Sequence, residues 1–279
     1  MHQETLNIIR KAKRYISISD DFRAVRLLRK LVKEKKGESV PFELLAELYF
    51  NRREWKPAFY YAEMALPKSL RKNKMWNIYG VCASALGKSS QANKAWKELQ
   101  LENVEFLERP IGLYYSDYKG NMLLNAQKIG PVHARILSIP VPGSFLNFGD
   151  VVLIDRKATS KAYSDGQIIK VHSFLAKLES SHSQTFSSIF YDCDQKDMDL
   201  LENMCENMGI FVDNWSSLNI QTLRSSTVIP SEFFDLRLNT ELDAIQYIAF
   251  ACRSKRKLSE VLSLWSNISQ KSHSDLESH

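Results

Sequence analysis

Apolar positions follow a helical period over the first hundred residues. In the segment MWNIYGVCASALGKSSQANKAWKEL, residues 75–99, large apolar side chains recur three or four residues apart on both sides of Gly87. This spacing places them along one face of an α-helix, so the segment predicts two amphipathic helices. Gly87 is typical of a helix end, and Ser89 or Ser90 is suited to cap the next helix. The segment therefore predicts a helical hairpin.

The same pattern recurs with a period of 34 residues. Sliding the segment back by 34 places Trp76 on Phe42 and Gly80 on Ala46, and a second slide places Ala46 on Ala12. Small side chains let neighbouring helices approach closely, and stacked hairpins bury faces that one hairpin leaves exposed. Each copy has a small residue at the same two places: Ala12, Ala46 and Gly80 in the first helix, and Ala24, Ala58 and Ala92 in the second.

This recurrence resembles the tetratricopeptide repeat (TPR) family over about residues 5–106. The most similar copy is 73–106, where WNIYGVCA resembles the Trp, Leu-Gly, Tyr signature of the family. The proline that usually closes a repeat is absent at the matching places, Leu70 and Val104. The resemblance implies a curved array of helical hairpins that binds partners on its concave face. The alternative is a helical bundle without repeats.

In a TPR array the first helix of each hairpin lines the groove. Helical geometry then predicts these partner-binding residues: Lys13, Glu43, Glu47, Phe50, Asn51, Lys74, Asn77, Val81 and Ser84. One TPR subclass grips an acidic chaperone C-terminus with Lys and Asn side chains. Lys13 and Asn77 fit that pattern, whereas Ile9 and Glu43 do not. We therefore expect an amphipathic helix or an extended peptide in the groove.

After residue 109 the apolar period changes from helical to alternating. IGLYYSDYKGNMLL predicts two strands around a turn, and VHARILSIPV, GDVVLID, GQIIKVHSF, TFSSIFYD, IFVDNW and SLNIQTL predict further strands. DQKDMDLLENMCENMG predicts a helix that Asp194 caps and Gly209 ends. We therefore expect residues 110–235 to form an α+β domain with a mostly antiparallel sheet. Its strand–helix–strand unit at 186–215 is similar to ferredoxin-like regulatory domains.

The C-terminal segment returns to strongly apolar windows. NTELDAIQYIAFACRS and KRKLSEVLSLWSNI predict a helical pair over residues 236–270, and we expect a disordered tail at 271–279. The expected architecture is a TPR-like helical hairpin array at 1–109, followed by the α+β domain and these C-terminal helices.

Composition is that of a soluble globular protein without a membrane span. The 279 residues are 44% apolar and 25% charged, and no run approaches 18 consecutive apolar residues. The N-terminus lacks the features of a signal peptide, and the four cysteines show no metal-type spacing. We therefore expect a cytoplasmic protein with reduced thiols.

Positive charge gathers near the N-terminus. Residues 1–109 carry 22 Lys and Arg against 13 Asp and Glu, whereas the rest carries 16 against 19. The candidate basic patch is Arg23, Arg26, Arg29, Lys30 and Lys33. Such a patch indicates either a well-solvated helical face or a surface for an acidic partner.

Two constellations bear on catalysis and metal binding. Asp192, Asp194, Asp197 and Asp199 lack the glycine and distant Glu of a calcium loop, so helix capping explains them better. VPGSFLNFGDVVLID resembles the signature of self-cleaving repressors and signal peptidases, which pair a serine with a later lysine. Here the serine is Ser144, and Lys170 or Lys177 is the later lysine. Met does not follow Ser144, and turns that bound a strand explain the glycines more simply.

No histidine has metal-type spacing, and no phosphate-binding glycine motif is present. We therefore expect no catalytic residues, no metal and no cofactor, and an enzyme whose active site in residues 110–235 is assembled only by the fold stays as a third alternative. The expected function is a non-enzymatic adaptor or regulator that binds a partner peptide or helix in the concave groove. The alternative is a nucleic-acid-associated regulator that uses the basic patch.

Overall fold

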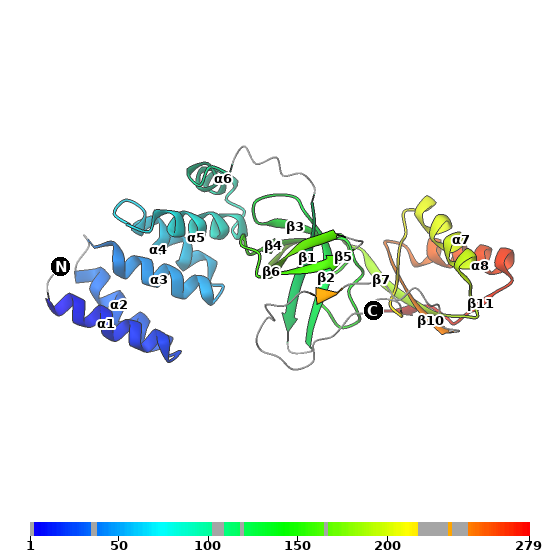
Figure 1. The fold of residues 1–279 in the computed structure, drawn as a ribbon, viewed down its shortest axis with the longest axis horizontal. Coiled ribbons are helices and arrows are strands. Elements are labelled where there is room, and N and C mark those ends of the chain that lie inside the picture. Colours follow the sequence, from blue (N-terminus) through cyan, green and yellow to red (C-terminus); the bar gives the residue numbers. More distant parts are fainter. Residues whose placement is uncertain are drawn as a thin grey trace. The chain divides into compact units, whose positions relative to one another are not determined.

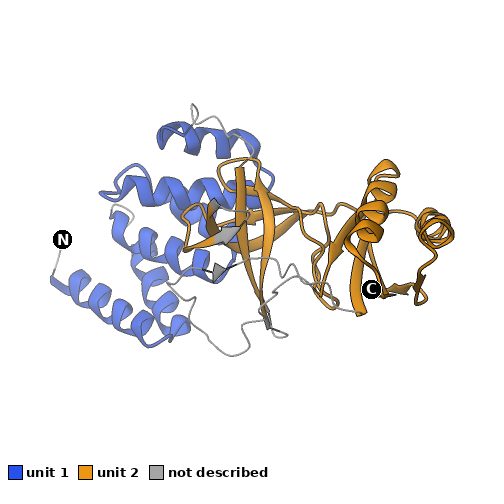
Figure 2. Ribbon diagram, turned by 45° about the vertical axis from the view of Figure 1, so that its right-hand side comes forward, with its two compact units in different colours: residues 1–105 blue, residues 106–279 orange. Residues whose placement is uncertain are grey.

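The chain divides into two compact units. The computed structural model describes residues 3–34, 38–101, 109–117, 120–164, 167–216, 234–235 and 245–279. Unit 1 is Met1–Glu105 and unit 2 is Phe106–His279 (Figure 2). The division falls close to the predicted boundary at residue 109. The first unit is helical and the second is rich in strands, so the predicted change of class along the chain is confirmed.

The described residues of unit 1 form six helices that pack in sequence order. They are α1 (Gln3–Ser17), α2 (Asp21–Glu34), α3 (Ser39–Asn51), α4 (Trp55–Ala65), α5 (Lys72–Ala85) and α6 (Ser89–Glu98). Each odd-numbered helix packs on the next helix, and α2 contacts α3 as α4 contacts α5 (Figure 1). α3 also contacts α5, the first helix of the following pair. The hairpins predicted from the hydrophobic period are therefore present.

Small residues lie at the recurring positions inside these pairs. Ala12, Ala24, Ala46, Ala58, Gly80 and Ala92 are all buried. At Gly80, an added Cβ atom would lie 2.6 Å from Cη2 of Trp96 in α6. The close crossing of α5 and α6 therefore requires glycine at this position.

The first part of unit 2 is a closed five-stranded barrel. Its strands are β1 (Arg109–Asp117), β2 (Gly120–Lys128), β3 (His133–Ile136), β4 (Val151–Ile154) and β6 (Gln167–Glu179). Neighbours in this order pair antiparallel, and a parallel pairing of β1 with β6 closes the ring. β5 (Ser160–Ser164) pairs with β6 and with β9 (Phe234–Asp235). Ile111, Leu113, Ile136 and Phe174 are among the side chains that fill the barrel core.

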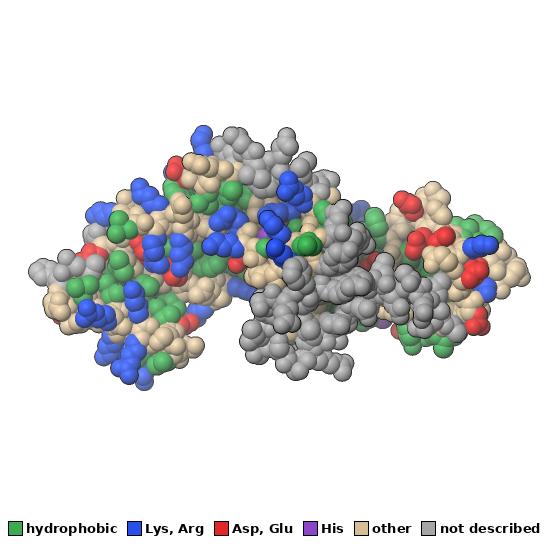
Figure 3. Space-filling model, in the orientation of Figure 1, with side chains coloured by type: hydrophobic (Ala, Val, Ile, Leu, Met, Phe, Trp, Pro, Cys, Tyr) green, Lys and Arg blue, Asp and Glu red, His purple; other side chains and the backbone are tan. Residues whose placement is uncertain are grey.

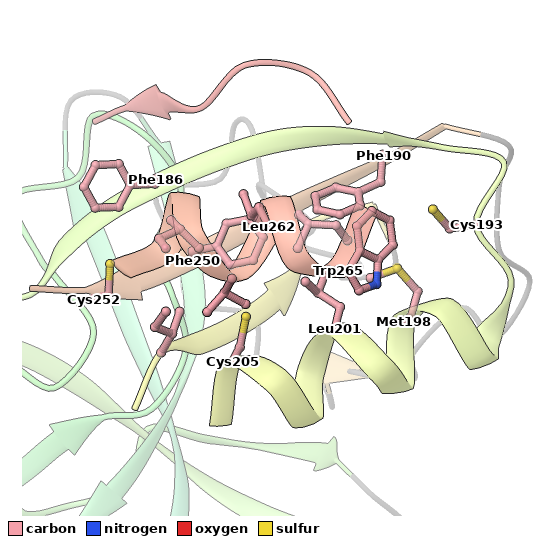
Figure 4. Close-up of a cluster of buried hydrophobic side chains, with 14 residues drawn as sticks. Phe186, Phe190, Cys193, Met198, Leu201, Cys205, Phe250, Cys252, Leu262 and Trp265 are labelled. Carbon is pink, nitrogen blue, oxygen red and sulfur yellow. The ribbon is translucent and has the colours of Figure 1, made fainter. Parts of the chain in front are cut away.

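The second part of unit 2 is a split βαβ layer. Its elements are β7 (Gln184–Tyr191), α7 (Gln195–Asn207), β8 (Phe211–Asn214), β10 (Ile245–Cys252), α8 (Lys255–Ser269), β11 (Ser272–His273) and β12 (Glu277–Ser278). The strand order β11-β7-β10-β8, with a helix after β7 and after β10, is that of ferredoxin-like domains. Phe186, Phe190 and Phe250 of the sheet share one buried cluster with Leu201 of α7 and Trp265 of α8 (Figure 4).

Three expectations for the C-terminal region need correction. The helix expected around IQYIAFAC is the strand β10, which lies between β7 and β8. Both faces of β10 are covered along most of its length, so its apolar run lacks the alternation of an exposed strand. The C-terminal helical pair is therefore reduced to α8, and residues 236–244, at the start of the expected pair, lie outside the described residues.

The tail expected to be disordered carries β11 and β12, which both pair with β7. Backbone pairing with β7 orders residues whose side chains are mostly polar, and polar composition alone does not reveal such pairing. β5 has no counterpart among the predicted strands, and SLNIQTL, predicted as a strand, lies outside the described residues.

Candidate partner-binding groove

The predicted groove residues lie on α1, α3 and α5, the first helices of the three pairs. Three of them, Lys13, Glu47 and Asn51, line one hollow of about 120 Å³ between α1 and α3. Ile16, Leu44 and Leu48 complete its walls. The structure therefore brings together side chains from the first and second helical hairpins. The hollow combines an apolar floor with a cation, a carboxylate and an amide at its rim.

A charged network joins α3 to the start of α5. Arg71 Nε and Nη2 lie 2.8 Å and 2.7 Å from Oε2 of Glu43. Arg71 Nη1 lies 2.8 Å from Oε1 of Glu47, and Lys74 Nζ lies 2.8 Å from the other oxygen of the same carboxylate. A guanidinium that bridges two carboxylates fixes their orientation more firmly than a lysine does. The network therefore holds Glu43 and Glu47 in place.

Glu43 is only 3% exposed, so it is an internal ion-pair partner rather than a groove surface. Burial alone would raise the pKa of Glu43, but hydrogen bonds from Ser69 and Arg71 outweigh burial and hold the pKa below its ordinary value. The prediction that Glu43 faces a ligand is therefore wrong. The sequence gives no local signal for this pair, because Arg71 is 28 residues away.

Two residues of α5 are also buried against expectation. Val81 is 1% exposed and Ser84 is 9% exposed. α5 packs against three helices, α3, α4 and α6. A larger part of its surface is therefore buried than in an amphipathic helix that packs on one face only. Lys13, Asn51 and Lys74 are exposed, and Glu47, Phe50 and Asn77 are partly exposed. These six residues form the accessible part of the predicted groove.

The basic patch lies on the exposed face of α2. Arg23, Arg26, Arg29, Lys30 and Lys33 are all exposed, and Figure 3 shows Lys and Arg side chains gathered over the α1–α2 end of unit 1. Arg23 lies 3.4 Å from Asp20, and Lys30 lies 3.8 Å from Glu34. Arg26 and Lys33 have no carboxylate partner among the described residues.

The next feature is the pair Ser144 and Lys177, which the sequence resemblance to self-cleaving repressors and signal peptidases singled out. Lys177 Nζ on β6 lies 2.8 Å from Oδ2 of Asp150, which is fully buried, and donates to the carbonyl of Phe145 at 3.0 Å. Ser144 Oγ accepts a hydrogen bond from the backbone N–H of Leu146 at 3.0 Å. A serine nucleophile needs a base within hydrogen-bond reach of its hydroxyl. Here the lysine bonds the buried carboxylate instead, so these side chains brace the loop between β3 and β4.

Lys170, the other lysine considered, lies opposite Lys161 in the β5–β6 pairing. The aspartates near residue 194 serve helix α7. Asp194 and Asp197 form a reciprocal capping box, with the Asp197 N–H donating to Asp194 Oδ1 at 3.0 Å. The predicted cap at Asp194 is thus confirmed. Within the described ranges, no group of three or more His, Cys, Asp or Glu side chains is placed to hold a metal ion.

All four cysteines are free and buried. Burial raises the pKa of the Cys82 and Cys205 thiols to about 12, and that of the Cys193 thiol to about 11. A thiolate is the reactive form of cysteine, so these side chains act as core residues. The packing of Cys193, Cys205 and Cys252 in one cluster with Phe250 agrees with that role (Figure 4).

Comparison with known proteins gives no family for the chain. No protein-family model and no curated protein sequence matches it. One solved structure, of a hypothetical protein from Neisseria gonorrhoeae, aligns with 60% of this chain and 93% of its own, at 16% identity and a TM-score of 0.29. Among the described residues, no helix is both long enough and apolar enough to cross a membrane.

Proposed function

We propose that unit 1 is a TPR-like adaptor domain of a cytoplasmic protein, and that α1 and α3 bind a segment of a partner protein. Stacked helix pairs with buried small residues at a 34-residue recurrence support this architecture. Such arrays present an extended surface built from the same helix of every pair. Unit 2 then supplies a second, regulatory or ligand-binding part.

The observation that carries the proposal is the hollow between α1 and α3. Its volume of about 120 Å³ is smaller than the roughly 300–1,000 Å³ typical of cofactor and drug-sized sites. A cavity of this size suits one apolar side chain of a peptide, seated against Ile16, Leu44 and Leu48. This is the manner in which an amphipathic helix anchors in a groove.

The rim charges select the flanks of that peptide. Glu47 is already engaged by Arg71 and Lys74. Lys13 is exposed and has no carboxylate partner among the described residues. The partner segment that fits best therefore carries an apolar anchor beside an acidic residue, which would pair with Lys13.

Site-specific photo-crosslinking in cells tests this proposal. A photo-reactive amino acid replaces Asn51 at the rim of the hollow, and in a second protein it replaces Lys11, which is exposed on α1 and does not line the hollow. The proposal expects one covalent partner band from position 51 that position 11 does not give. Equal crosslinking patterns from the two positions would contradict it.

A second candidate function rests on the stripe Arg23, Arg26, Lys30 and Lys33, spaced three or four residues apart along α2. Cations at that spacing lie on one helix face and can follow a phosphate backbone. RNA or DNA binding whose affinity falls steeply with salt, and which the double variant Arg26→Glu/Lys33→Glu abolishes, would favour this function over the adaptor.

A further inference from the structure

Unit 2 contains a cavity between the barrel and the split βαβ layer. Its volume is about 570 Å³, which is in the range of small-molecule sites. The barrel contributes the ends of β3 and β6 and the start of β4. The other layer contributes the turn between α7 and β8 and the segment that joins β10 to α8.

Specific contacts fix the two walls of this cavity. The Phe148 and Phe211 rings lie 3.9 Å apart between centroids. Trp215 Nε1 donates to the carbonyl of Ile139 at 3.1 Å, and the Ile139 N–H donates to a carboxylate oxygen of Asp213. Ile139 also packs with Ala249 and Ala251 of β10. The cavity is therefore bounded by two packed layers.

Three cations converge on the cavity from separate elements. Arg135 comes from β3, Arg253 follows β10, and Lys257 lies in the first turn of α8. None of them has a carboxylate partner among the described residues, and Glu179 is the one acidic side chain of the lining. The N-terminal end of α8 adds to the positive potential, since its N-cap Ser254 also lines the cavity. The lining thus carries a net charge of about +2 at neutral pH.

Another part of the lining is apolar. Phe211 is 52% exposed beside Phe148, and Val151, Ile210 and Ala251 continue this surface. An exposed aromatic face next to these three cations suits a ligand with a planar or apolar body and an anionic end. Gly149 and Gly209 also line the cavity, with φ values of +82° and +66° that disfavour larger residues.

We propose that this cavity binds a small molecule with one phosphate or carboxylate group on an apolar or planar body. Arg253 and Lys257 hold the anion, Arg135 neutralises its outer charge, and Phe211 contacts the body. Because the site spans two layers of unit 2, its occupancy stabilises their junction. Neither the helical groove nor the basic stripe of unit 1 takes part in this binding.

Calorimetric titration of the full chain tests the proposal with a matched set of probes: phenyl phosphate, benzoate, inorganic phosphate and phenol. We expect phenyl phosphate or benzoate to bind at least about tenfold more tightly than inorganic phosphate and phenol, a difference of about 1.4 kcal/mol. The difference in affinity between phenyl phosphate and benzoate shows whether the site prefers a phosphate or a carboxylate.

The double variant Arg253→Gln/Lys257→Gln is expected to weaken the tighter probe at least about tenfold. Arg256→Gln is the control, because Arg256 lies on the same turn of α8 but pairs with Glu260 and does not line the cavity. All three positions are exposed, so the variants are expected to fold. Absence of binding up to about 10 mM, equal binding of inorganic phosphate, or equal loss in the control would overturn the proposal.

Discussion

Gly80 of α5 lies against the indole ring of Trp96 of α6, and a Cβ atom at position 80 would approach Cη2 of that ring to 2.6 Å. Trp96 is 4% exposed, so the ring cannot swing into solvent without opening the helix pair. This contact joins a small residue in the first helix of the third hairpin to a large residue in its second helix.

Gly80→Ala should therefore destabilise unit 1. Alanine favours the helix by about 1 kcal/mol over glycine, whereas overpacking a filled core costs about 1–3 kcal/mol. We expect a net loss of up to about 2 kcal/mol in the free energy of unfolding, measured in urea. In a Trp96→Phe background, which lacks the clashing ring atoms, the Gly80→Ala substitution should cost less than in the wild type. Equal costs in the two backgrounds would show that Trp96 does not set the helix approach.

Arg71→Met should destabilise the protein more at pH 7 than at pH 4. The pKa of Glu43 lies below its ordinary value in the folded protein, so the ion pair contributes stability above about pH 4.5 that is lost as pH falls through the folded pKa. Without Arg71, the buried carboxylate loses its cationic partner and keeps only its serine hydrogen bonds, so we expect a loss of about 1–3 kcal/mol at pH 7. Protonation of Glu43 at pH 4 removes most of that cost. Lys72→Met, at the neighbouring exposed position, should show no such pH dependence.

Lys177→Met should cost much more stability than Ser144→Ala. Asp150 is fully buried, and although the Asn147 and Ser181 N–H groups also bond it, Lys177 is its cationic partner. Removing one partner of a buried ion pair costs about 3–5 kcal/mol. Lys170→Met on the same strand is the control and should have little effect. If Lys177→Met proved neutral, the lysine would not be the brace of the β3–β4 loop.

Asp213→Asn should stabilise unit 2 at neutral pH. Burial raises the pKa of Asp213 from 3.8 to about 6, and the hydrogen bond from Ile139 opposes that rise. The folded state therefore holds the proton more tightly than the unfolded state, so stability falls as pH rises from about 4 to about 6. Unfolding curves at pH 5 and pH 7.5 should show this loss in the wild type and not in Asp213→Asn, with a difference of about 1.4 kcal/mol between the two pH values. Asp275→Asn, at an exposed site, should leave the profile unchanged.

The parts of the fold that local patterns encode were predictable from sequence. Hydrophobic period and glycine breaks indicated the hairpins of unit 1, and the Asp194 cap marked the start of α7. The strand β10 was not predictable, because its two covered faces remove the alternation that marks a strand. A buried strand and a buried helix look alike in such a run.

The site was predicted only in part, for a similar reason. Helical geometry placed Lys13, Glu47 and Asn51 on one side of their helices, and the hollow brings them together. It did not reveal Arg71, whose partner Glu43 lies 28 residues earlier. The unit 2 cavity also has no local motif, since Arg135 and Arg253 meet there only through tertiary packing.

The most direct test of the adaptor proposal is to measure the affinity of the crosslinked partner for two variants of this protein that carry matched charge reversals. Lys13→Glu reverses the cation at the rim of the hollow, and Lys11→Glu makes the same change at an exposed position of α1 that does not line it. The proposal predicts that Lys13→Glu weakens partner binding at least about tenfold, while Lys11→Glu stays within about twofold of the wild type. Equal affinities for Lys13→Glu and the wild type would contradict it.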